Sequence, residues 1–241
     1  MQYCDVMPRL PRIVIPDVPH HVTQRGNNKQ DVFFVDDDKR VYLDILHAQS
    51  ERYGFRIYGY CLMTNHVHVI GTPATEDSLA KTLGRTHFLY TLYVNRMHDR
   101  SGHLWQNRFY SCAMDEEHSL KALCYVELNP VRAGMAAHAW EYPWSSARAH
   151  CGDTQESDLL RLDDWRETMP ADTWRELLEA FQDDSEAAAK MHLHTRTGRP
   201  LGRDSFLSHV ECLLGRRVRP LPVGRPLGWR KKARTLGKGK K

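Results

Sequence analysis

The sequence lacks paired cysteines and long apolar runs. Its six cysteines are Cys4, Cys61, Cys112, Cys124, Cys151 and Cys212. None of them forms a C-x-x-C pair, which argues against a structural zinc site and against a disulfide framework. No apolar stretch approaches the roughly 20 residues of a membrane span, and the proline-containing N-terminus lacks the apolar core of a signal peptide. We therefore expect a cytoplasmic protein that does not cross a membrane.

Acidic residues are missing from the C-terminal end of the chain. Residues 216–241 contain 11 Lys and Arg and no acid, although the net charge of all 241 residues is only +4. Residues 152–189 show the opposite bias, with 12 acids against three arginines. The basic end is either a solvated tail or an arm that binds a polyanion. These shifts predict three parts: a catalytic domain at 10–150, an acidic helical connector at 151–195, and a basic Gly/Arg/Pro-rich extension at 196–241.

Apolar periodicity and turn residues predict the order of the elements. We expect strands at 20–25, 55–63, 65–72 and 103–113, and helices at 36–54, 77–98 and 119–128. Acids at 36–38 suit a first helical turn, and Gly54 suits a helix end. The order β-α-β-β-α-β-α is typical of an antiparallel ferredoxin-like sheet. We therefore predict an α+β fold with helices packed on this sheet, followed by a helical and basic C-terminal extension.

Two histidines interrupt an otherwise apolar strand. The segment 60–70 reads YCLMTNHVHVI, with His66 and His68 two residues apart. Successive side chains of a strand point to opposite faces, so both imidazoles share one face while Val67 and Val69 fill the other. The two imidazoles are about 7 Å apart along the strand and can converge on one metal ion. The alternative is a pair of half-exposed histidines on an open sheet.

A tyrosine and an asparagine lie off the apolar stripe of the last predicted helix. The stripe comprises Leu120, Leu123, Cys124, Leu128 and Val131. Tyr125 and Asn129 are four residues apart, which places a hydroxyl and an amide oxygen on one helix face. Asn129-Pro130 is also typical of an N-cap followed by proline, which would put Asn129 outside the helix that carries Tyr125. Tyr125 alone is equally compatible with an ordinary surface aromatic.

These four side chains together suit one kind of chemistry. A divalent ion held by two imidazoles and one oxygen keeps open positions for phosphate oxygens. A neighbouring tyrosine can attack phosphorus and hold one side of the broken strand as a phosphotyrosine. Because this linkage stores the bond energy for religation, it suits strand transfer better than simple hydrolysis.

Several sequence blocks carry a resemblance to one family. They are His21-Val22-Thr23 with 25–27, the segments 60–63 and 65–68, the segment 102–109, the segment 125–134, and the segment 142–146. In this order they resemble the REP-associated tyrosine transposases. These are relatives of the small single-tyrosine transposases of bacterial insertion sequences, within the His-hydrophobic-His endonuclease superfamily. The resemblance spans roughly residues 10 to 150.

The resemblance implies a mechanism and its residues. By it, His66 and His68 are metal ligands, Asn129 is the third ligand, and Tyr125 is the nucleophile. It also implies Mg²⁺ or Mn²⁺ as cofactor and single-stranded DNA as substrate, cut at the foot of a palindromic hairpin to leave a free 3′-OH. Two positions depart from the family pattern, because Thr64 replaces a common proline and Asn107 a common glycine.

Candidate DNA-binding residues are basic or polar and lie in four places. Gln106 and Arg108 alternate along the predicted fourth strand, and Arg25 precedes the turn at 26–28. The motif Gly-Arg-Pro-Leu-Gly occurs twice and contains Arg199 and Arg225, with a basic segment between the copies. That segment contributes Arg216, Arg217 and Arg219. Gly-Arg-Pro within a basic run resembles arms that enter the minor groove of DNA. Each of these residues is also compatible with a solvated surface.

These observations predict a metal-dependent tyrosine DNA nickase and transposase that acts on single-stranded hairpin DNA. The sequence leaves open whether it is a monomer or a homodimer, and we expect it to associate with the nucleoid. Three alternatives remain. The protein could be a catalytically silent regulator that binds hairpin DNA, a replication-initiator or relaxase-type nickase, or a simple metal phosphodiesterase.

Overall fold

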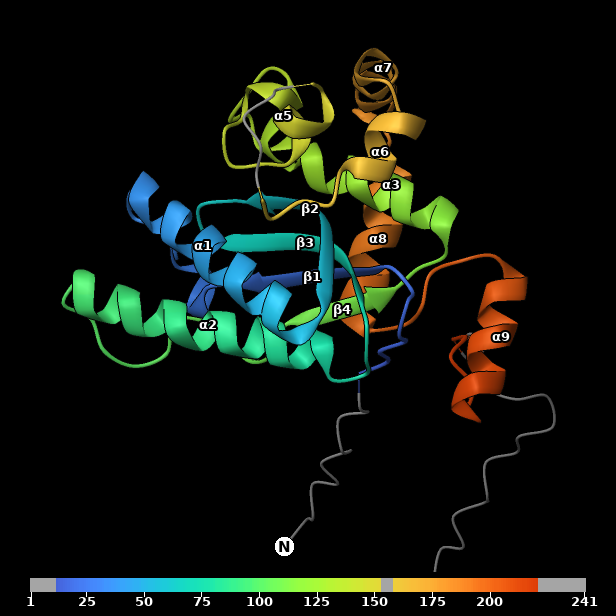
Figure 1. The fold of residues 1–241 in the computed structure, drawn as a ribbon, viewed down its shortest axis with the longest axis horizontal. Helices are drawn as coiled ribbons and strands as arrows, with labels where there is room; N and C mark the ends of the chain where they lie inside the picture. Colours follow the sequence, from blue (N-terminus) through green and yellow to red (C-terminus); the bar gives the residue numbers. More distant parts are fainter. Residues whose placement is uncertain (1–11, 153–157, 221–241) are drawn as a thin grey trace, which may run out of the picture.

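A four-stranded antiparallel sheet forms the centre of the protein. The computed structural model describes residues 12–152 and 158–220. The strands are β1 (His20–Arg25), β2 (Phe55–Leu62), β3 (His66–Pro73) and β4 (Tyr110–Ala113), in the spatial order β2-β3-β1-β4 (Figure 1). All three strand pairs are antiparallel. The order and the two crossing helices confirm the predicted ferredoxin-like α+β fold.

Two long helices cover one face of the sheet. They are α1 (Asp36–Tyr53) and α2 (Ser78–Met97), which lie side by side in Figure 1. Acids occupy the first turn of α1, where the helix dipole favours them, and Gly54 ends it at φ 65°, a backbone conformation that suits glycine. Tyr42, Leu46, Leu79 and Leu83 are fully buried between these helices and the sheet. This layer forms the larger apolar core.

The opposite face of the sheet carries α3 (Glu116–Glu127), followed at once by the short α4 (Asn129–Arg132). Asp115 caps α3, since its side chain accepts a hydrogen bond from the backbone N–H of His118. Because of this cap, α3 begins three residues before the predicted start at Ser119. Gly59 in β2 permits close packing, because a Cβ there would lie 2.2 Å from Leu123 of α3. This contact fixes the height of α3 above the sheet.

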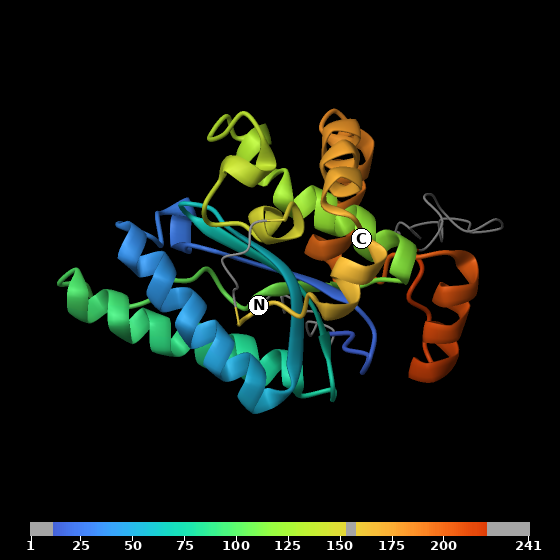
Figure 2. The same cartoon turned by 45° about the horizontal axis from the view of Figure 1, so that its top comes forward.

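Further helices complete the part of the chain that the structure describes. They are the short η1 (Asn27–Lys29) and η2 (Ala139–Glu141), then α5 (Ala147–His150), α6 (Asp163–Thr168), α7 (Ala171–Phe181), α8 (Ser185–Thr197) and α9 (Asp204–Leu214), of which η1 precedes α1. Helix α8 packs against β4, β1 and α3 (Figures 1 and 2). The predicted acidic connector therefore contributes a helix to the sheet surface. None of the helices within the described ranges is long and apolar enough to span a bilayer.

The fourth strand is shorter than predicted. Only Tyr110–Ala113 pairs as β4, whereas the preceding residues 103–109 run as an irregular segment. Trp105 makes a single bridge to Gly26, and Asn107 adopts φ 57°, a left-handed conformation that interrupts a strand. Gln106 and Arg108 therefore do not alternate along a strand, which corrects the prediction that placed them on one strand face.

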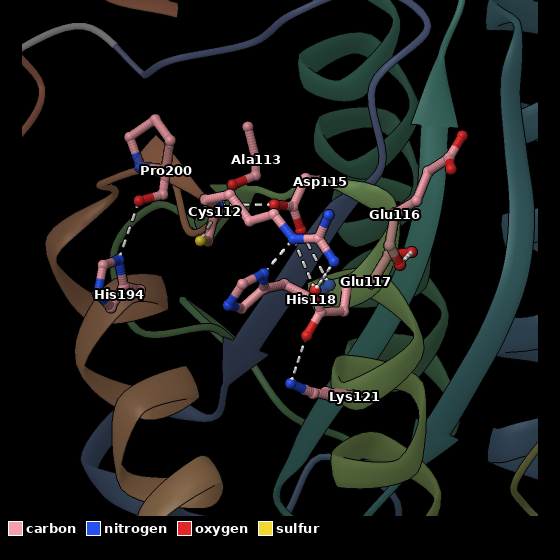
Figure 3. Close-up of polar contacts among 11 residues, drawn as sticks. Cys112, Ala113, Asp115, Glu116, Glu117, His118, Lys121, His194 and Pro200 are labelled. Carbon is pink, nitrogen blue, oxygen red and sulfur yellow. Dashed lines mark hydrogen bonds and ion pairs between the residues drawn. The ribbon is translucent and has the colours of Figure 1, made fainter. Parts of the chain in front are cut away.

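The segment after α8 is bound to the edge of β4, as Figure 3 shows. The Leu201 N–H donates to the Ala113 carbonyl at 2.9 Å, and the Cys112 thiol donates to the Arg199 carbonyl at 3.1 Å. His194 Nδ1 contacts the Pro200 carbonyl at 3.0 Å, which ties the end of α8 to the same segment. These contacts hold α8 in place against the sheet.

Candidate active site and nucleic-acid surface

A polar cavity of about 390 Å³ lies where β1 and β3 meet α3, α4 and α8. Both histidines of the paired motif, the tyrosine and the asparagine reach it, together with residues that the sequence did not single out. Its walls are formed by His21, Thr23, Gln24, Arg25, Lys29, Asn65, His66, His68, Tyr110, Tyr125, Asn129, His192, Thr195 and Arg196. The four residues that the resemblance singled out thus share one cavity.

Strand alternation places the two histidines as predicted. Val67 and Val69 are fully buried in the core beneath α1 and α2, so His66 and His68 point to the other face. Their ring centroids are 5.0 Å apart and the rings are nearly perpendicular, at 80°. His66 Nδ1 contacts the Asn65 side-chain oxygen at 2.7 Å, and His68 Nδ1 contacts His21 Nε2 at 2.8 Å. Among the described residues, neither Nε2 atom has a hydrogen-bond partner.

Burial keeps these imidazoles neutral. It lowers the pKa of His66 to about 4, with Arg25 adding to the effect. Burial also lowers the pKa of His68, helped by the neighbouring His66 and His21, and lowers that of His21 to about 3. A neutral imidazole keeps the lone pair that a metal ion requires. Two such nitrogens therefore face the cavity at neutral pH.

Tyr125 lies edge-on to the histidines. Its ring centroid is 5.8 Å from that of His68 and 5.9 Å from that of His21. Burial raises the pKa of its phenol, while the guanidinium of Arg132, 4.6 Å from the ring centroid, opposes this rise. Its hydroxyl makes no hydrogen bond within the part of the chain that the structure describes, so the oxygen is available to a ligand in the cavity.

Asn129 is the first residue of α4, which follows α3 after a break at Leu128. Its Nδ2 donates to the backbone carbonyls of Tyr125 and Val126 at 3.1 and 3.2 Å. These bonds orient the amide and leave Oδ1 as its free acceptor. Asn129 therefore lies outside the helix that carries Tyr125 and still faces the same cavity.

The side chains present fit a divalent metal ion. The donor set consists of two neutral imidazoles and one amide oxygen, a mixture compatible with Mn²⁺ and less typical of Mg²⁺. Residues 12–152 and 158–220 contain no cluster of three or more His, Cys, Asp or Glu side chains placed to bind a metal. A site built from His66, His68 and Asn129 would thus depend on its amide ligand.

Sequence reasoning missed the contribution of α8. His192 and Thr195, which were assigned to the connector, and Arg196, which was assigned to the basic extension, line the cavity. The alternation of histidine and basic residues in 192–196 is the only local signal, and it does not reveal which surface the helix covers. His21 was recognised only as part of a strand motif. Long-range packing alone places it behind His68.

Arginines gather in a second cleft, of about 590 Å³, beside the first cavity. The basic side chains that line it are Arg12, Arg108, Arg196, Arg199, Arg216, Arg217 and Arg219. Burial and the nearby Arg108 lower the pKa of Arg12 to about 10. Tyr110, Thr195 and Arg196 line both hollows, so the arginine cleft adjoins the histidine cavity.

The predicted DNA-binding residues fall into separate groups. Arg108, Arg199, Arg216, Arg217 and Arg219 share the arginine cleft. Arg25 lines the histidine cavity and donates to the Gln106 side-chain oxygen at 3.0 and 3.1 Å. Arg219 is engaged in ion pairs with Glu211 and Asp204. Arg225 lies outside the described residues.

Comparison with known proteins identifies one family and two solved structures that are similar to this chain. Residues 15–129 match the family described as "Transposase IS200 like". The solved structure of a REP-associated tyrosine transposase bound to a REP hairpin is similar at a TM-score of 0.53 and 16% identity, over 64% of this chain and 92% of that one. A Deinococcus radiodurans R1 protein described as a transposase has a TM-score of 0.35 and 18% identity, over 49% of this chain and 95% of that one. None of the curated proteins matches the sequence.

The fold and the cavity define a ferredoxin-like α+β protein with a polar site between its sheet and the helices α3, α4 and α8. The family match runs from before β1 to Asn129 and includes both histidines and Tyr125. Residues 15–129 therefore match the IS200-like transposase family, in agreement with the resemblance that the sequence blocks indicated. This match supports a transposase-like role in DNA processing.

Proposed function

We propose that this protein is a metal-dependent, single-stranded DNA endonuclease and strand transferase whose nucleophile is Tyr125. The observation that carries the proposal is the convergence of Tyr125, His66, His68 and Asn129 on one cavity. These residues come from three elements separated in sequence, and each offers an unpaired oxygen or nitrogen to the cavity.

In the proposed reaction, His66, His68 and Asn129 hold Mn²⁺ or Mg²⁺, which when bound polarises the scissile phosphate and offsets its developing charge. Tyr125 Oη forms a bond to phosphorus while the bond from phosphorus to the 3′ oxygen breaks. The 3′ oxygen takes up a proton and becomes a free hydroxyl, and the phenolic proton passes to solvent. Burial disfavours the Tyr125 phenolate. The positive charge of the Arg132 guanidinium over the ring opposes this effect and favours the phenolate.

The proposed substrate is hairpin DNA with a single-stranded foot. A solved relative of similar fold is bound to a REP hairpin. In this chain the arginine cleft adjoins the cavity, so a strand whose phosphates lie in the cleft can reach Tyr125 past the exposed ring of Tyr110. Tyr125 lies beside His68 of the same chain, which supports a site completed within one protomer, in a monomer or in a homodimer.

The test is a denaturing gel of end-labelled hairpin DNA incubated with the full chain and Mn²⁺. We expect a covalent protein–DNA band with the wild type and none with Tyr125→Phe. His66→Ala should lower cleavage by at least about 100-fold, since one metal ligand is lost. Tyr53→Phe is the matched control, because Tyr53 ends α1 on the opposite face of the sheet. It should retain wild-type activity.

Each alternative function predicts a different gel. Cleavage that survives Tyr125→Phe without an adduct would indicate a simple metal phosphodiesterase. Tight hairpin binding without cleavage in Mn²⁺ or Mg²⁺ would indicate a silent regulator. Preference for a long duplex origin over a hairpin would favour a replication-initiator or relaxase-type nickase. The three-part domain division remains part of this proposal, and limited proteolysis of the full chain tests it.

A further inference from the structure

A chain of buried contacts leads from β3 through β1 into α8. His68 Nδ1 lies 2.8 Å from His21 Nε2, and His21 Nδ1 lies 2.8 Å from the Thr195 hydroxyl. Thr195 Oγ1 in turn donates to Met191 Sδ at 3.7 Å. The two imidazole rings are nearly coplanar and meet edge to edge through this N···N contact, with centroids 5.1 Å apart and planes within 4°. His21, His68 and Thr195 are all buried, so water does not compete for these contacts.

The direction of this chain decides which nitrogen of His68 carries the proton. Thr195 has one hydroxyl proton, and its contact with Met191 uses it, so the hydroxyl accepts from His21 Nδ1. His21 Nε2 is then an acceptor, and His68 Nδ1 must donate to it. The reverse direction would put the His68 proton on Nε2 and lose the contact with Met191. Only the first direction satisfies all three contacts.

His66 has a similar partner. Its Nδ1 lies 2.7 Å from the Asn65 side-chain oxygen, which can only accept. A flip of the Asn65 amide would break a hydrogen bond, because its Nδ2 donates to the Lys29 carbonyl at 3.1 Å. His66 is therefore protonated on Nδ1, and its Nε2 is unprotonated with a free lone pair.

We propose that His21 and Thr195 are positioning residues that hold His68 in the Nδ1-protonated form, with Nε2 free to bind a metal ion, and that Asn65 does the same for His66. This inference rests on the metal site of the proposed function. It makes α8, which lies outside the family-matched segment 15–129, a part of that site. Outer-shell partners of this kind typically change metal affinity by about 10–100-fold.

Thr195→Val separates the proposed role from simple packing. Valine keeps the approximate shape and removes the acceptor, so the His21 Nδ1 proton would be buried without a partner. Moving that proton to Nε2 of His21 avoids the unpaired donor, but it makes His68 Nδ1 an acceptor and transfers the His68 proton to Nε2. The variant is thus expected to reverse the tautomer of His68. Thr195→Ser retains the hydroxyl and should behave as wild type.

The direct test is nitrogen-15 NMR of ring-labelled histidines in the metal-free full chain, with the His68 signals assigned from a His68→Gln sample. We expect protonated Nδ1 and bare Nε2 in the wild type, and the reverse in Thr195→Val. A wild-type spectrum with the proton on Nε2 would overturn the inference without any variant. An unchanged tautomer in folded Thr195→Val would overturn it as well.

Mn²⁺ binding measured by electron paramagnetic resonance gives the second readout. We expect affinity to fall about 10-fold or more in Thr195→Val and His21→Phe, and to stay within about threefold of wild type in Thr195→Ser. Thr91→Val on α2, whose hydroxyl donates to the His87 carbonyl at 2.7 Å, is the matched control and should bind as wild type. Equal affinity of Thr195→Val and wild type would contradict the proposed role.

The same series distinguishes this inference from the proposed function. If His66→Ala binds Mn²⁺ as tightly as wild type, the proposed metal site is wrong. The tautomers measured without metal still decide whether His21 and Thr195 fix the proton position of His68. If Thr195→Val does not fold, the wild-type spectrum by itself remains decisive.

Discussion

Single buried side chains join distant parts of this protein, and Glu127 is the clearest case. Its Oε1 accepts from the Ser146 hydroxyl and from His150 Nδ1, both at 2.5 Å, and its Oε2 accepts from Trp174 Nε1 at 2.8 Å. All four residues are buried. Glu127 ends α3, Ser146 directly precedes α5, His150 ends α5, and Trp174 lies in α7. One carboxylate therefore ties the helix of Tyr125 to the helices beyond it.

Replacing Glu127 should cost stability in a graded way. Glu127→Ala leaves the buried N–H donors of His150 and Trp174 without an acceptor, while the Ser146 hydroxyl can still donate to the Tyr60 carbonyl, and it should lower the free energy of unfolding by about 3–5 kcal/mol. Glu127→Gln keeps one acceptor oxygen and the shape, so its loss should be roughly half as large. Urea unfolding followed by tryptophan fluorescence measures both values. Equal stability of wild type and Glu127→Ala would show that the cluster contributes nothing.

At the scale of elements, the arginine cleft depends on the packing of α8 and of the segments on either side of it. Arg108 precedes β4, Arg199 follows α8, and Arg217 follows α9. All three line the cleft, and their described contacts include no ion pair. Their charges therefore remain available to phosphates, in contrast to that of Arg219, which Glu211 and Asp204 engage.

The triple variant Arg108→Gln, Arg199→Gln, Arg217→Gln should weaken the salt dependence of hairpin binding. Each phosphate contact on single-stranded DNA contributes about 0.7 to the slope of log affinity against log salt, so the slope should fall by about 2. The matched control changes Arg40, Arg52 and Lys81 to Gln, which removes the same charge from α1 and α2. Equal slopes for the two triple variants would remove the cleft from the DNA-binding surface.

At the scale of the whole molecule, buried neutral histidines link stability to pH. Burial lowers the pKa of His20 to about 4 and the pKa values of His21 and His87 to about 3. In the unfolded chain a histidine has a pKa of about 6.5. Between these values the unfolded state binds more protons than the folded state, so stability rises with pH. This contribution is complete above about pH 6.5 and is lost as the pH falls toward 3–4.

As the pH falls from 6 to 4.5, we expect the free energy of unfolding of the metal-free protein to decrease by about 1 kcal/mol per pH unit for each of these histidines. His87→Gln should make this slope smaller by the contribution of one histidine, since glutamine can keep the contact of His87 with the Tyr42 hydroxyl, at 3.1 Å, without titrating. Exposed His103→Gln is the control. Urea unfolding at several pH values gives the slopes, and identical slopes for His87→Gln and wild type would contradict the assignment.

The sequence by itself determined the parts that obey short periods. Strand alternation placed His66 and His68 on one face, and the order of elements with its acids and turn glycines predicted the ferredoxin-like sheet. The same reasoning extended the fourth strand too far, because it could not detect the left-handed Asn107 or the turn of Trp105 into the core beside His87. Local patterns report backbone preference, and they are reliable where burial acts on one regular element.

Only the tertiary structure decided which distant residues meet at the site. Asn129 reaches the cavity although α3 ends before it, because its amide bonds back to the last turn of that helix. His21 lies behind His68 through strand pairing, and Thr195 reaches His21 because the segment after α8 is bound to β4. Such contacts join residues up to 174 positions apart, as between His21 and Thr195. They depend on packing between whole elements, a quantity that no local periodicity contains.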